Sequence, residues 1–388
     1  MADSLKVIKN GQIITPTQIL DTHHFVVVEG SKIAHIGNQQ TEHLPKDAEV
    51  IDAQGKLVSP GLVDIHVHGC MGYKSSDATH EALNTISKTF AAHGVTGFLA
   101  TSHADPEIFR KIAAVVDKGV EGARILGIHS EGPFLNPKKK GAQYPEHLSE
   151  CKPDYLRELI SSASGLLKQM TIAPELPGAH ELIEILDKRN IVPAMGHTYA
   201  SYDECIEGIK HGVRHVTHCF NAMRDIEHRE PGGAGASVVS DELSAEIICD
   251  GVHVHPAVIK MMIRTKPRDK VVLITDAIQV AGQPDGEYIQ DKKLGVKVFV
   301  INGEARLNPT TLAGSSLFMN RGLKNVIEFG NLNLVEGVRM GSYNPALVIG
   351  METRKGTLEV GKEADIVFFD EDFNVHLTMV EGKIVYKA

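Results

Sequence analysis

The sequence predicts an α/β fold, in which a (β/α)8, TIM-like barrel is joined to a small β-sandwich domain built from both chain ends. From about residue 60 to 345, eight short runs rich in Val and Ile alternate with helical segments, which is the pattern of a parallel barrel. Before and after this region the chain shows only short strand-like segments separated by turns. We therefore expect a barrel at residues 57–349 and a β-sandwich at residues 1–56 plus 350–388.

The two chain ends have the character of small β-structures. Residues 5–55 include "KVIKNGQIITP" and "HHFVVVEGSKIAHIG", and Asn10-Gly11 is a hairpin signal. Residues 356–388, from "GTLEVGKEADIVFFD" to "VEGKIVYKA", have the same character. Neither end holds enough apolar residues for a core of its own, so we expect the two to pair into one domain beside the barrel.

The predicted barrel strands lack polar–apolar alternation, as expected for strands buried on both faces. The closing parts of these strands are residues 62–67, 97–101, 125–129, 170–173, 191–195, 215–217, 246–249 and 271–275. The segments between them are helical; Leu156, Leu159, Ile160 and Ala163 follow the helical period, and another helix is expected to stop at His93-Gly94. A doubly wound sheet is disfavoured because no Gly-rich phosphate turn follows the first strand. Residues 283–307 are expected to form a hairpin insertion.

Composition and charge exclude several classes of protein. Hydrophobic residues make up 42% and charged residues 23%, as in soluble globular chains. No apolar stretch approaches the roughly 18 residues of a membrane span, and the N-terminus lacks a signal-peptide core, so we expect a cytoplasmic protein without a membrane partner. A net charge of −9 argues against nucleic-acid binding. The five scattered cysteines are expected to be buried thiols, and the 20 histidines are unusually many.

Residues that bind metals follow five of the predicted strands at the end where a barrel forms its active site. These ends read "DIHVH", "HSEGPFL", "AMGHT", "THCFNAM" and "LITDA". The candidate ligands are His66, His68, Glu131, His197, His218 and Asp276. Imidazole and carboxylate are the usual ligands of zinc and of divalent iron, manganese or cobalt. We expect one or two such ions per chain.

Each of these residues also has a purely structural interpretation. The histidines would then be polar core residues bonded to backbone, and the two carboxylates would cap helices. Placement of all six at the same end of five strands favours the metal site. His129 lies two residues before Glu131 and is expected to support the ligands from behind. Other histidines, such as His80, His93, His103, His147, His180 and His211, are expected to be structural or on the surface.

The motifs "VSPGLVDIHVHG" and "GTLEVGKEADIVFF" resemble the amidohydrolase superfamily of metal-dependent hydrolases. Within it, "HSEGPFLNPKKKGAQ", "GHTYA", "THCFNAMRDIEHREPG", "CDGVHV", "TDA" and "TLAGSSL" are similar to the N-acetylglucosamine-6-phosphate deacetylase family. The resemblance covers nearly the whole chain. It implies a homodimer that hydrolyses the acetamide of N-acetyl-D-glucosamine 6-phosphate to D-glucosamine 6-phosphate and acetate.

The resemblance also bears on the number of metals. Many members of the superfamily bridge two metals with a carboxylated lysine after the fourth strand, but here Lys168 lies at the other end of that strand. Glu131 is therefore the expected bridge. Some deacetylases lack the HxH pair and carry one metal, with His at the position of Gln143. Because this chain keeps His66 and His68, we interpret the pattern as a two-metal site.

Roles follow for the individual groups. A metal at Glu131, His197 and His218 would lower the pKa of bound water and provide hydroxide near neutral pH. A second metal at the HxH pair would polarise the acetyl carbonyl. Asp276 is the expected general acid–base, which takes the water's proton and returns it to the leaving nitrogen; a role as metal ligand is compatible with this.

Substrate contacts are implied by the resemblance. Arg229 would bind the phosphate from the neighbouring subunit, with a surface ion pair to Glu230 or Asp225 as its alternative. Backbone N–H groups of Asn221 and Ala222 would add donors. The other expected contacts are Ala142, Gln143, Asp250, Gly251, Val252, His253, Leu312, Ala313 and Gly314.

Three rival functions remain open at this level. The protein would be another metal-dependent amidohydrolase, of the dihydroorotase, hydantoinase or aminoacylase type, if it turned over an unphosphorylated substrate faster. A scaffold that had lost its metals would show none on elemental analysis. A sugar-phosphate-binding regulator would bind its ligand without releasing acetate.

Overall fold

A computed structural model describes residues 5–291 and 295–388 and confirms the predicted barrel. Eight strands form one parallel sheet in the order β17-β16-β15-β14-β13-β12-β11-β8. Their bounds are β8 Leu62–Val67, β11 Val95–Ser102, β12 Arg124–Glu131, β13 Leu167–Ile172, β14 Val192–Met195, β15 His215–Val216, β16 Ser244–Ile248 and β17 Val271–Ile274. Every residue of β8 and β11 is buried. This two-sided burial explains the absence of alternation in the sequence.

Hydrogen bonds between β8 and the end of β17 close the sheet at its carboxyl ends. The backbone N–H of Asp276 donates to the His66 carbonyl at 2.9 Å, and that of His68 donates to the Ala277 carbonyl at 2.8 Å. Below them, the buried Asp64 accepts from the Thr275 hydroxyl at 2.6 Å. Closure therefore brings the first strand's histidines directly beside the eighth strand's aspartate.

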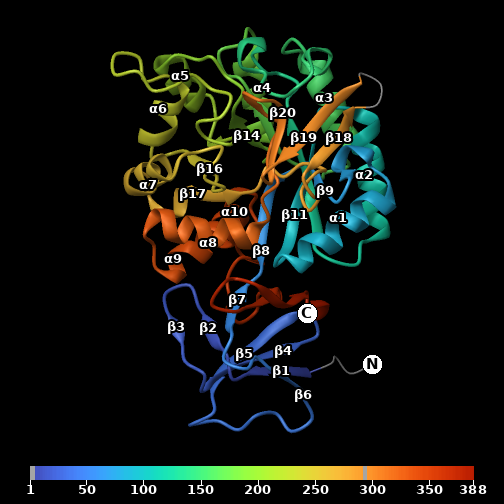
Figure 1. The fold of residues 1–388 in the computed structure, drawn as a ribbon, viewed down its shortest axis with the longest axis vertical. Helices are drawn as coiled ribbons and strands as arrows, with labels where there is room; N and C mark the ends of the chain where they lie inside the picture. The colour runs from blue at the N-terminus through green and yellow to red at the C-terminus, as the bar shows by residue number, and fades with distance from the viewer. Residues whose placement is uncertain (1–4, 292–294) are drawn as a thin grey trace.

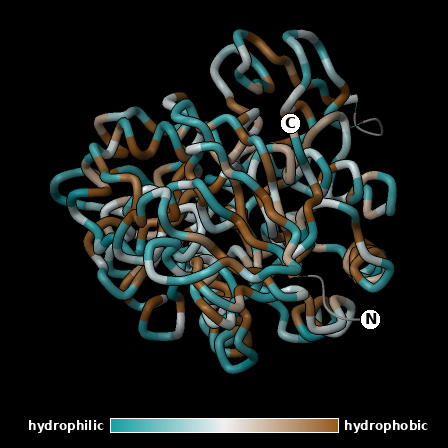
Figure 2. The backbone as a smooth tube through the Cα atoms, turned by 90° about the horizontal axis from the view of Figure 1, so that it is seen from below, coloured by the Kyte–Doolittle hydropathy of each residue, from teal (hydrophilic) through white to brown (hydrophobic). Residues whose placement is uncertain are grey.

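Helices cover the outside of the barrel (Figure 1). Their bounds are α1 His80–Ala92, α2 Pro106–Lys118, α3 Pro153–Ser162, α4 Ala179–Lys188, α5 Tyr202–Lys210, α6 Gly232–Val239, α7 Pro256–Thr265, α8 Met319–Gly330, α9 Leu334–Gly341 and α10 Tyr343–Val348. The helix expected to stop at His93-Gly94 is α1, and the one expected around Leu156 is α3. In Figure 2 hydrophilic stretches of the backbone lie along much of the periphery, and hydrophobic stretches run through the middle of the view. No helix among the described residues is long and apolar enough to span a membrane.

The two chain ends pair with each other, as predicted. One sheet has the order β5-β4-β1-β6 and the other β24-β23-β22-β7-β2-β3. The bounds are β1 Leu5–Lys9, β2 Gln12–Ile14, β3 Ile19–Leu20, β4 His24–Glu29, β5 Lys32–Asn38, β6 Glu49–Asp52, β7 Leu57–Pro60, β22 Ile366–Phe369, β23 Val375–Val380 and β24 Lys383–Lys387. Ile8 and Val26 from one end share a core with Ile366 and Phe368 from the other. Figure 1 shows both ends together below the barrel. The division of the chain at residues 56 and 350 stays a prediction.

The hairpin predicted at Asn10-Gly11 is wrong. Strand β1 pairs with β4 and β6, whereas β2 pairs with β3 and β7, so the turn carries the chain from one sheet to the other. Asn10 adopts φ 58°, and its amide donates to Asp52 at 2.9 Å. A Cβ at Gly11 would lie 2.5 Å from a methyl of Val58. Close packing of two sheets, not a two-residue hairpin, therefore requires this glycine.

An insertion follows the eighth barrel strand, where the sequence predicted a hairpin at residues 283–307. It is an antiparallel sheet in the order β18-β19-β20-β21. The strands are β18 Gly286–Asp291, β19 Val296–Ile301, β20 Glu304–Asn308 and β21 Thr311–Leu312. Residues 292–294 of the predicted hairpin lie outside the described residues. In Figure 1 these orange strands lie at the barrel end away from the β-domain, where they contribute to the site described next.

Candidate active site

The structure brings the six candidate metal ligands together at the barrel mouth. They form two groups, and within each group the ligand atoms lie within 4.8 Å of one another. One group is His66, His68 and Asp276; the other is Glu131, His197 and His218. The ligands come from the ends of β8 and β12 and from the turns after β14, β15 and β17. The parallel barrel therefore gathers residues that are up to 210 positions apart in the chain.

The carboxylate of Glu131 lies between the two groups and is only 4% exposed. Its Oε1 lies 3.1 Å from Nε2 of both His197 and His218. His66 Nε2 lies 3.4 Å from Oε1, and His68 Nε2 lies 3.3 Å from Oε2. Burial alone would raise the pKa of Glu131, but the four neighbouring imidazoles hold it well below its usual range. Oε1 therefore faces nitrogens of both groups, and Oε2 faces His68 of the first group.

Outer hydrogen bonds orient two of the imidazoles. Nδ1 of His197 lies 2.9 Å from the Lys139 carbonyl, and Nδ1 of His66 lies 2.8 Å from the carboxylate of Glu246. Because a carbonyl and a carboxylate only accept, each Nδ1 carries the proton and each Nε2 presents a lone pair to the site. This is the usual arrangement for a metal-binding histidine.

The donor set fits divalent metal ions. Nε2 of His197 and Nε2 of His218 lie 3.0 Å apart and converge on the same carboxylate oxygen. In the described part of the chain, the buried Nε2 of His66 has no hydrogen-bond partner. A buried nitrogen left without a partner is costly, and a cation shared by these nitrogens and carboxylates would satisfy it.

Three of the ligands adopt a left-handed backbone. The φ angles are 48° at His197, 27° at His218 and 51° at Asp276. Such conformations cost about 1–3 kcal/mol each for residues other than glycine, and they cluster at functional sites. A neighbouring loop holds Asp276 in this conformation, because the Ser315 N–H donates to the Asp276 carbonyl at 2.8 Å. A Cβ at Gly314 would lie 3.0 Å from the same carbonyl, so glycine is needed for this approach.

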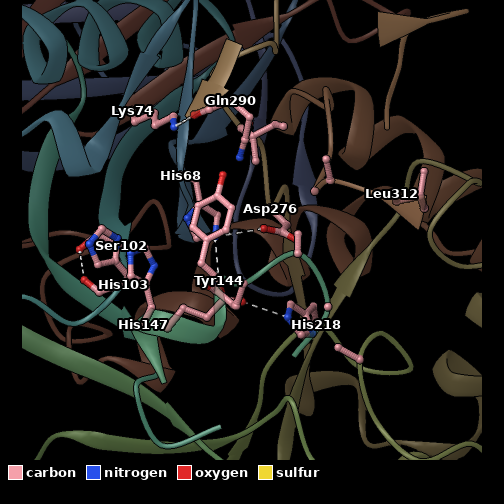
Figure 3. Close-up of a pocket in the computed structure, with 18 of the residues that line it drawn as sticks. His68, Lys74, Ser102, His103, Tyr144, His147, His218, Asp276, Gln290 and Leu312 are labelled. Carbon is pink, nitrogen blue, oxygen red and sulfur yellow. Dashed lines mark hydrogen bonds and ion pairs between the residues drawn. The ribbon is translucent and has the colours of Figure 1, made fainter. Parts of the chain in front are cut away.

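A cavity of about 290 Å³ opens over the ligands (Figure 3). Its walls include eight of the expected substrate contacts: Ala142, Gln143, Asn221, Ala222, His253, Leu312, Ala313 and Gly314. The side-chain amide of Gln143 donates to Glu131. Asp250 and Val252 line a neighbouring pocket that shares His253 and Leu312. Neither pocket wall includes Gly251 or Arg229.

Asp250 acts on the cavity through His253. Its Oδ2 lies 2.6 Å from His253 Nδ1, and its Oδ1 accepts from the backbone N–H groups of Val252 and His253 at 2.8 Å. Asp250 therefore fixes the imidazole with Nδ1 protonated, which leaves Nε2 free to bind a hydroxyl in the cavity. Its carboxylate serves to orient His253.

Arg229 lies on an exposed loop between β15 and α6. Its backbone N–H donates to Glu227 at 2.9 Å. Neither of the partners considered from the sequence engages its guanidinium: Glu230 accepts from the backbone of Tyr202 and Gly232, and Asp225 faces Lys139 at 4.0 Å. Within the described ranges, the guanidinium has no ion-pair partner and stays available to a ligand.

Sequence reasoning missed several residues at this site. His103 and His147, expected to be structural or on the surface, also line the cavity, and their rings stack with centroids 3.9 Å apart. Burial beside His147 lowers the pKa of His103 to about 4. His103 follows the second barrel strand in "TSHAD", so the strand-end rule would have found it. In Figure 3, His68 lies between this pair and Leu312.

Another missed residue is Glu246, which is fully buried in β16 and contacts His66. Its signal was a single acidic residue within the apolar run "SAEII". The supporting role expected for His129 agrees with its position, because its ring packs edge-on against His66 with centroids 4.5 Å apart.

Comparison with known proteins places this geometry in a family. The model of the amidohydrolase family matches residues 57–385. The N-acetylglucosamine-6-phosphate deacetylase of Vibrio furnissii is 38% identical over 85% of this chain and 83% of its own. The N-acetylgalactosamine-6-phosphate deacetylase of Escherichia coli O157:H7 is 31% identical over 97% of this chain and 98% of its own.

A solved structure of similar fold contains a ligand. It is a mutant N-acetyl-D-glucosamine-6-phosphate deacetylase from Mycobacterium smegmatis in complex with N-acetyl-D-glucosamine-6-phosphate. Its TM-score is 0.90 at 31% identity, and the match covers 99% of this chain and 100% of that one. Together with the family match over most of its length, this similarity shows that the chain belongs to the amidohydrolase family.

Proposed function

We propose that this protein hydrolyses the acetamide of N-acetyl-D-glucosamine 6-phosphate to D-glucosamine 6-phosphate and acetate. The observation that carries the proposal is the convergence of four imidazoles and two carboxylates at the barrel mouth, beside a cavity lined by further polar groups such as Gln143, Asn221 and His253. Relatives named for this activity support the choice of substrate. We place the reaction in the cytoplasm, because the five cysteines are free thiols and suit a reducing compartment.

His66, His68 and Asp276 would hold one divalent ion, and His197 and His218 would hold another, with Glu131 shared between them. When bound, such ions polarise a carbonyl and lower the pKa of water. Both effects help to overcome the low reactivity of an acetamide. Zinc, iron, manganese and cobalt all accept these ligands. We propose one or two ions per chain.

Asp276 is the proposed proton carrier. Its Oδ1 lies 3.5 Å from His66 Nε2 and 3.4 Å from His68 Nε2, which leaves Oδ2 to take a proton from the attacking water. The same oxygen would return this proton to the amide nitrogen as the C–N bond breaks, because an amine leaves far more easily than its anion.

The sugar and its phosphate would lie on the side of the cavity formed by the turns after β15 and β16 and by the end of β21. His253, oriented by Asp250, would bind a sugar hydroxyl. The backbone N–H groups of Asn221 and Ala222 would donate to the phosphate. We propose a homodimer in which Arg229 reaches the phosphate from the other subunit, which would give its unpaired guanidinium a partner.

A second candidate substrate is N-acetyl-D-galactosamine 6-phosphate, the C4 epimer, because a relative named for it aligns along almost the whole chain. Both substrates would use the same metal ligands and the same proton carrier. Only the contact to the C4 hydroxyl would differ, and we favour the glucosamine substrate because the relatives named for it include the more similar chain from Vibrio furnissii.

An acetate-release assay tests the proposal most simply. Purified protein should release acetate from the glucosamine substrate with a higher kcat/KM than from its C4 epimer, from unphosphorylated N-acetylglucosamine or from cyclic amides. Removing divalent ions with a chelator should abolish the release, and adding them back should restore it. Full activity in a verified metal-free sample would contradict the mechanism, and faster turnover of a cyclic amide would contradict the substrate.

The variant Asp276→Asn tests the proton carrier. Its turnover should fall by ~10²–10⁴-fold, the usual contribution of a positioned acid–base, while binding of the sugar phosphate largely survives. Metal content must be measured in parallel, because Asp276 is also a proposed ligand. Asp372→Asn, an exposed carboxylate of the β-domain, is the control. Near wild-type turnover in Asp276→Asn with its metals bound would exclude this role.

The variant Arg229→Ala tests phosphate recognition across the dimer. Loss of one charge-assisted contact should raise KM for the 6-phosphate by about 10- to 150-fold and change KM for unphosphorylated N-acetylglucosamine far less. Arg157→Ala, which removes an exposed arginine on α3, should change neither.

Mixed dimers extend this test. Combining Arg229→Ala with Asp276→Asn chains should restore some activity, because one of the two sites then holds both original groups. If Arg229→Ala raised KM equally for the 6-phosphate and for unphosphorylated N-acetylglucosamine, Arg229 would not contact the phosphate. Absence of recovery in confirmed heterodimers would place it in its own subunit's site.

A further inference from the structure

A buried carboxylate with no assigned role lies beneath the proposed metal ligands. Glu246, on β16, is 0% exposed. Its Oε2 accepts from His66 Nδ1 at 2.8 Å and from the backbone N–H of His218 at 2.9 Å. Its Oε1 accepts from the Gln169 amide at 2.7 Å and faces Nε2 of His215 at 3.2 Å. Four donors from β8, β13, β15 and the turn after β15 thus converge on this carboxylate inside the barrel.

A buried charge of this kind persists only when its surroundings compensate for the lost water. Burial raises the pKa of Glu246, but the nearby His66 and the hydrogen bonds from His215 and His66 hold it well below its usual range. Packing alone gives no reason for a carboxylate here, because the adjacent residues of β16 are apolar.

The two contacts of Oε2 join the two groups of ligands. His66 belongs to one group, and Glu246 fixes its tautomer so that Nε2 faces the site. His218 belongs to the other, and the same oxygen holds its backbone N–H where φ is 27°. Some carboxylates accept a hydrogen bond from the outer nitrogen of a ligating histidine. Mutating such a carboxylate typically lowers metal affinity or activity by about 10–100-fold.

We propose that Glu246 is a positioning residue that aligns His66 and the His218 backbone at once and so couples the two metal-binding groups. The inference rests on the proposed metal site. Glu246 touches neither the cavity nor any expected substrate atom, so its effect must pass through the ligands.

The variant Glu246→Gln isolates the charge. Its amide oxygen can still accept from His66 and from the His218 backbone. The amide NH₂ would then face Gln169 and His215. Gln169 can rotate its amide to present Oε1, which is buried without a partner in the described structure. His215 can exchange tautomers, because Ser244 Oγ, 2.7 Å from its Nδ1, both donates and accepts. The variant should therefore fold. Glu246→Leu removes both the charge and the hydrogen bonds.

The test is a cobalt(II) titration of metal-free protein. Calorimetry measures the affinity, and the visible absorption of the bound ion reports its ligand geometry. Glu246→Gln should bind cobalt about 10-fold more weakly and Glu246→Leu about 100-fold more weakly, within the range for outer-shell groups. The absorption spectrum should change in Glu246→Leu, because the ligand geometry changes.

The matched control is Asp365→Asn, another buried carboxylate, which bonds Lys355 at 2.5 Å at the start of β22. It should lower the melting temperature of the metal-free protein and leave cobalt affinity unchanged. Equal weakening in this control would assign the effect to general destabilisation and overturn the proposal.

Wild-type cobalt affinity in a folded Glu246→Leu protein would also overturn it. If Glu246→Leu does not fold, wild-type cobalt affinity in Glu246→Gln would overturn the proposal instead. Failure of the unmodified protein to bind cobalt would remove the metal site and this inference together, whereas normal binding with unaffected variants would remove the inference alone.

Discussion

The contact between one buried carboxylate and four imidazoles is the constraint on which the rest of the site depends. Glu131 has Nε2 atoms of His66, His68, His197 and His218 within 3.1–3.4 Å of its oxygens. An isolated charge at this depth would be strongly unfavourable, so the carboxylate and its partners stabilise each other. Moving any of these strand ends would leave a polar group without a partner. The barrel must therefore close, and it does so by the hydrogen bonds from the Asp276 N–H to the His66 carbonyl and from the His68 N–H to the Ala277 carbonyl.

A second layer of contacts keeps the ligands in place. The Lys139 carbonyl and the Glu246 carboxylate fix two of the rings, and the left-handed backbone at Asp276 is held by a hydrogen bond from Ser315. The barrel strands and the turns after them carry the candidate ligands. The Lys139 carbonyl and the Glu246 carboxylate form the second layer, which orients those ligands. The proposed substrate contacts are different in kind, because Asn221, His253 and Arg229 lie on loops and turns outside the barrel strands.

The parts of this architecture that follow a regular period could be predicted from the sequence. Barrel strands such as β8 and helices such as α1 were found because their apolar residues follow the periods of buried strands and amphipathic helices. The convergence of the six candidate ligands could be predicted because parallel strands end at a common mouth. Pairing between distant segments was less accessible. Asn10-Gly11 marked a turn, but whether β1 pairs with β2 depends on which sheet each strand joins. Glu246 was missed because nothing local shows that its neighbours across the barrel are His66 and Gln169.

Anomalous diffraction from crystals soaked with a divalent ion would test the central claim most directly. The account predicts a peak at about 2.0–2.2 Å from ligand atoms of Glu131, His197 and His218, and a second peak beside His66, His68 and Asp276 when both positions are filled. In crystals of Glu131→Ala, whose shared ligand is missing, the peaks should weaken or vanish. Peaks that avoid the Glu131 carboxylate in the unmodified protein, or that persist at full height in the variant, would contradict the account.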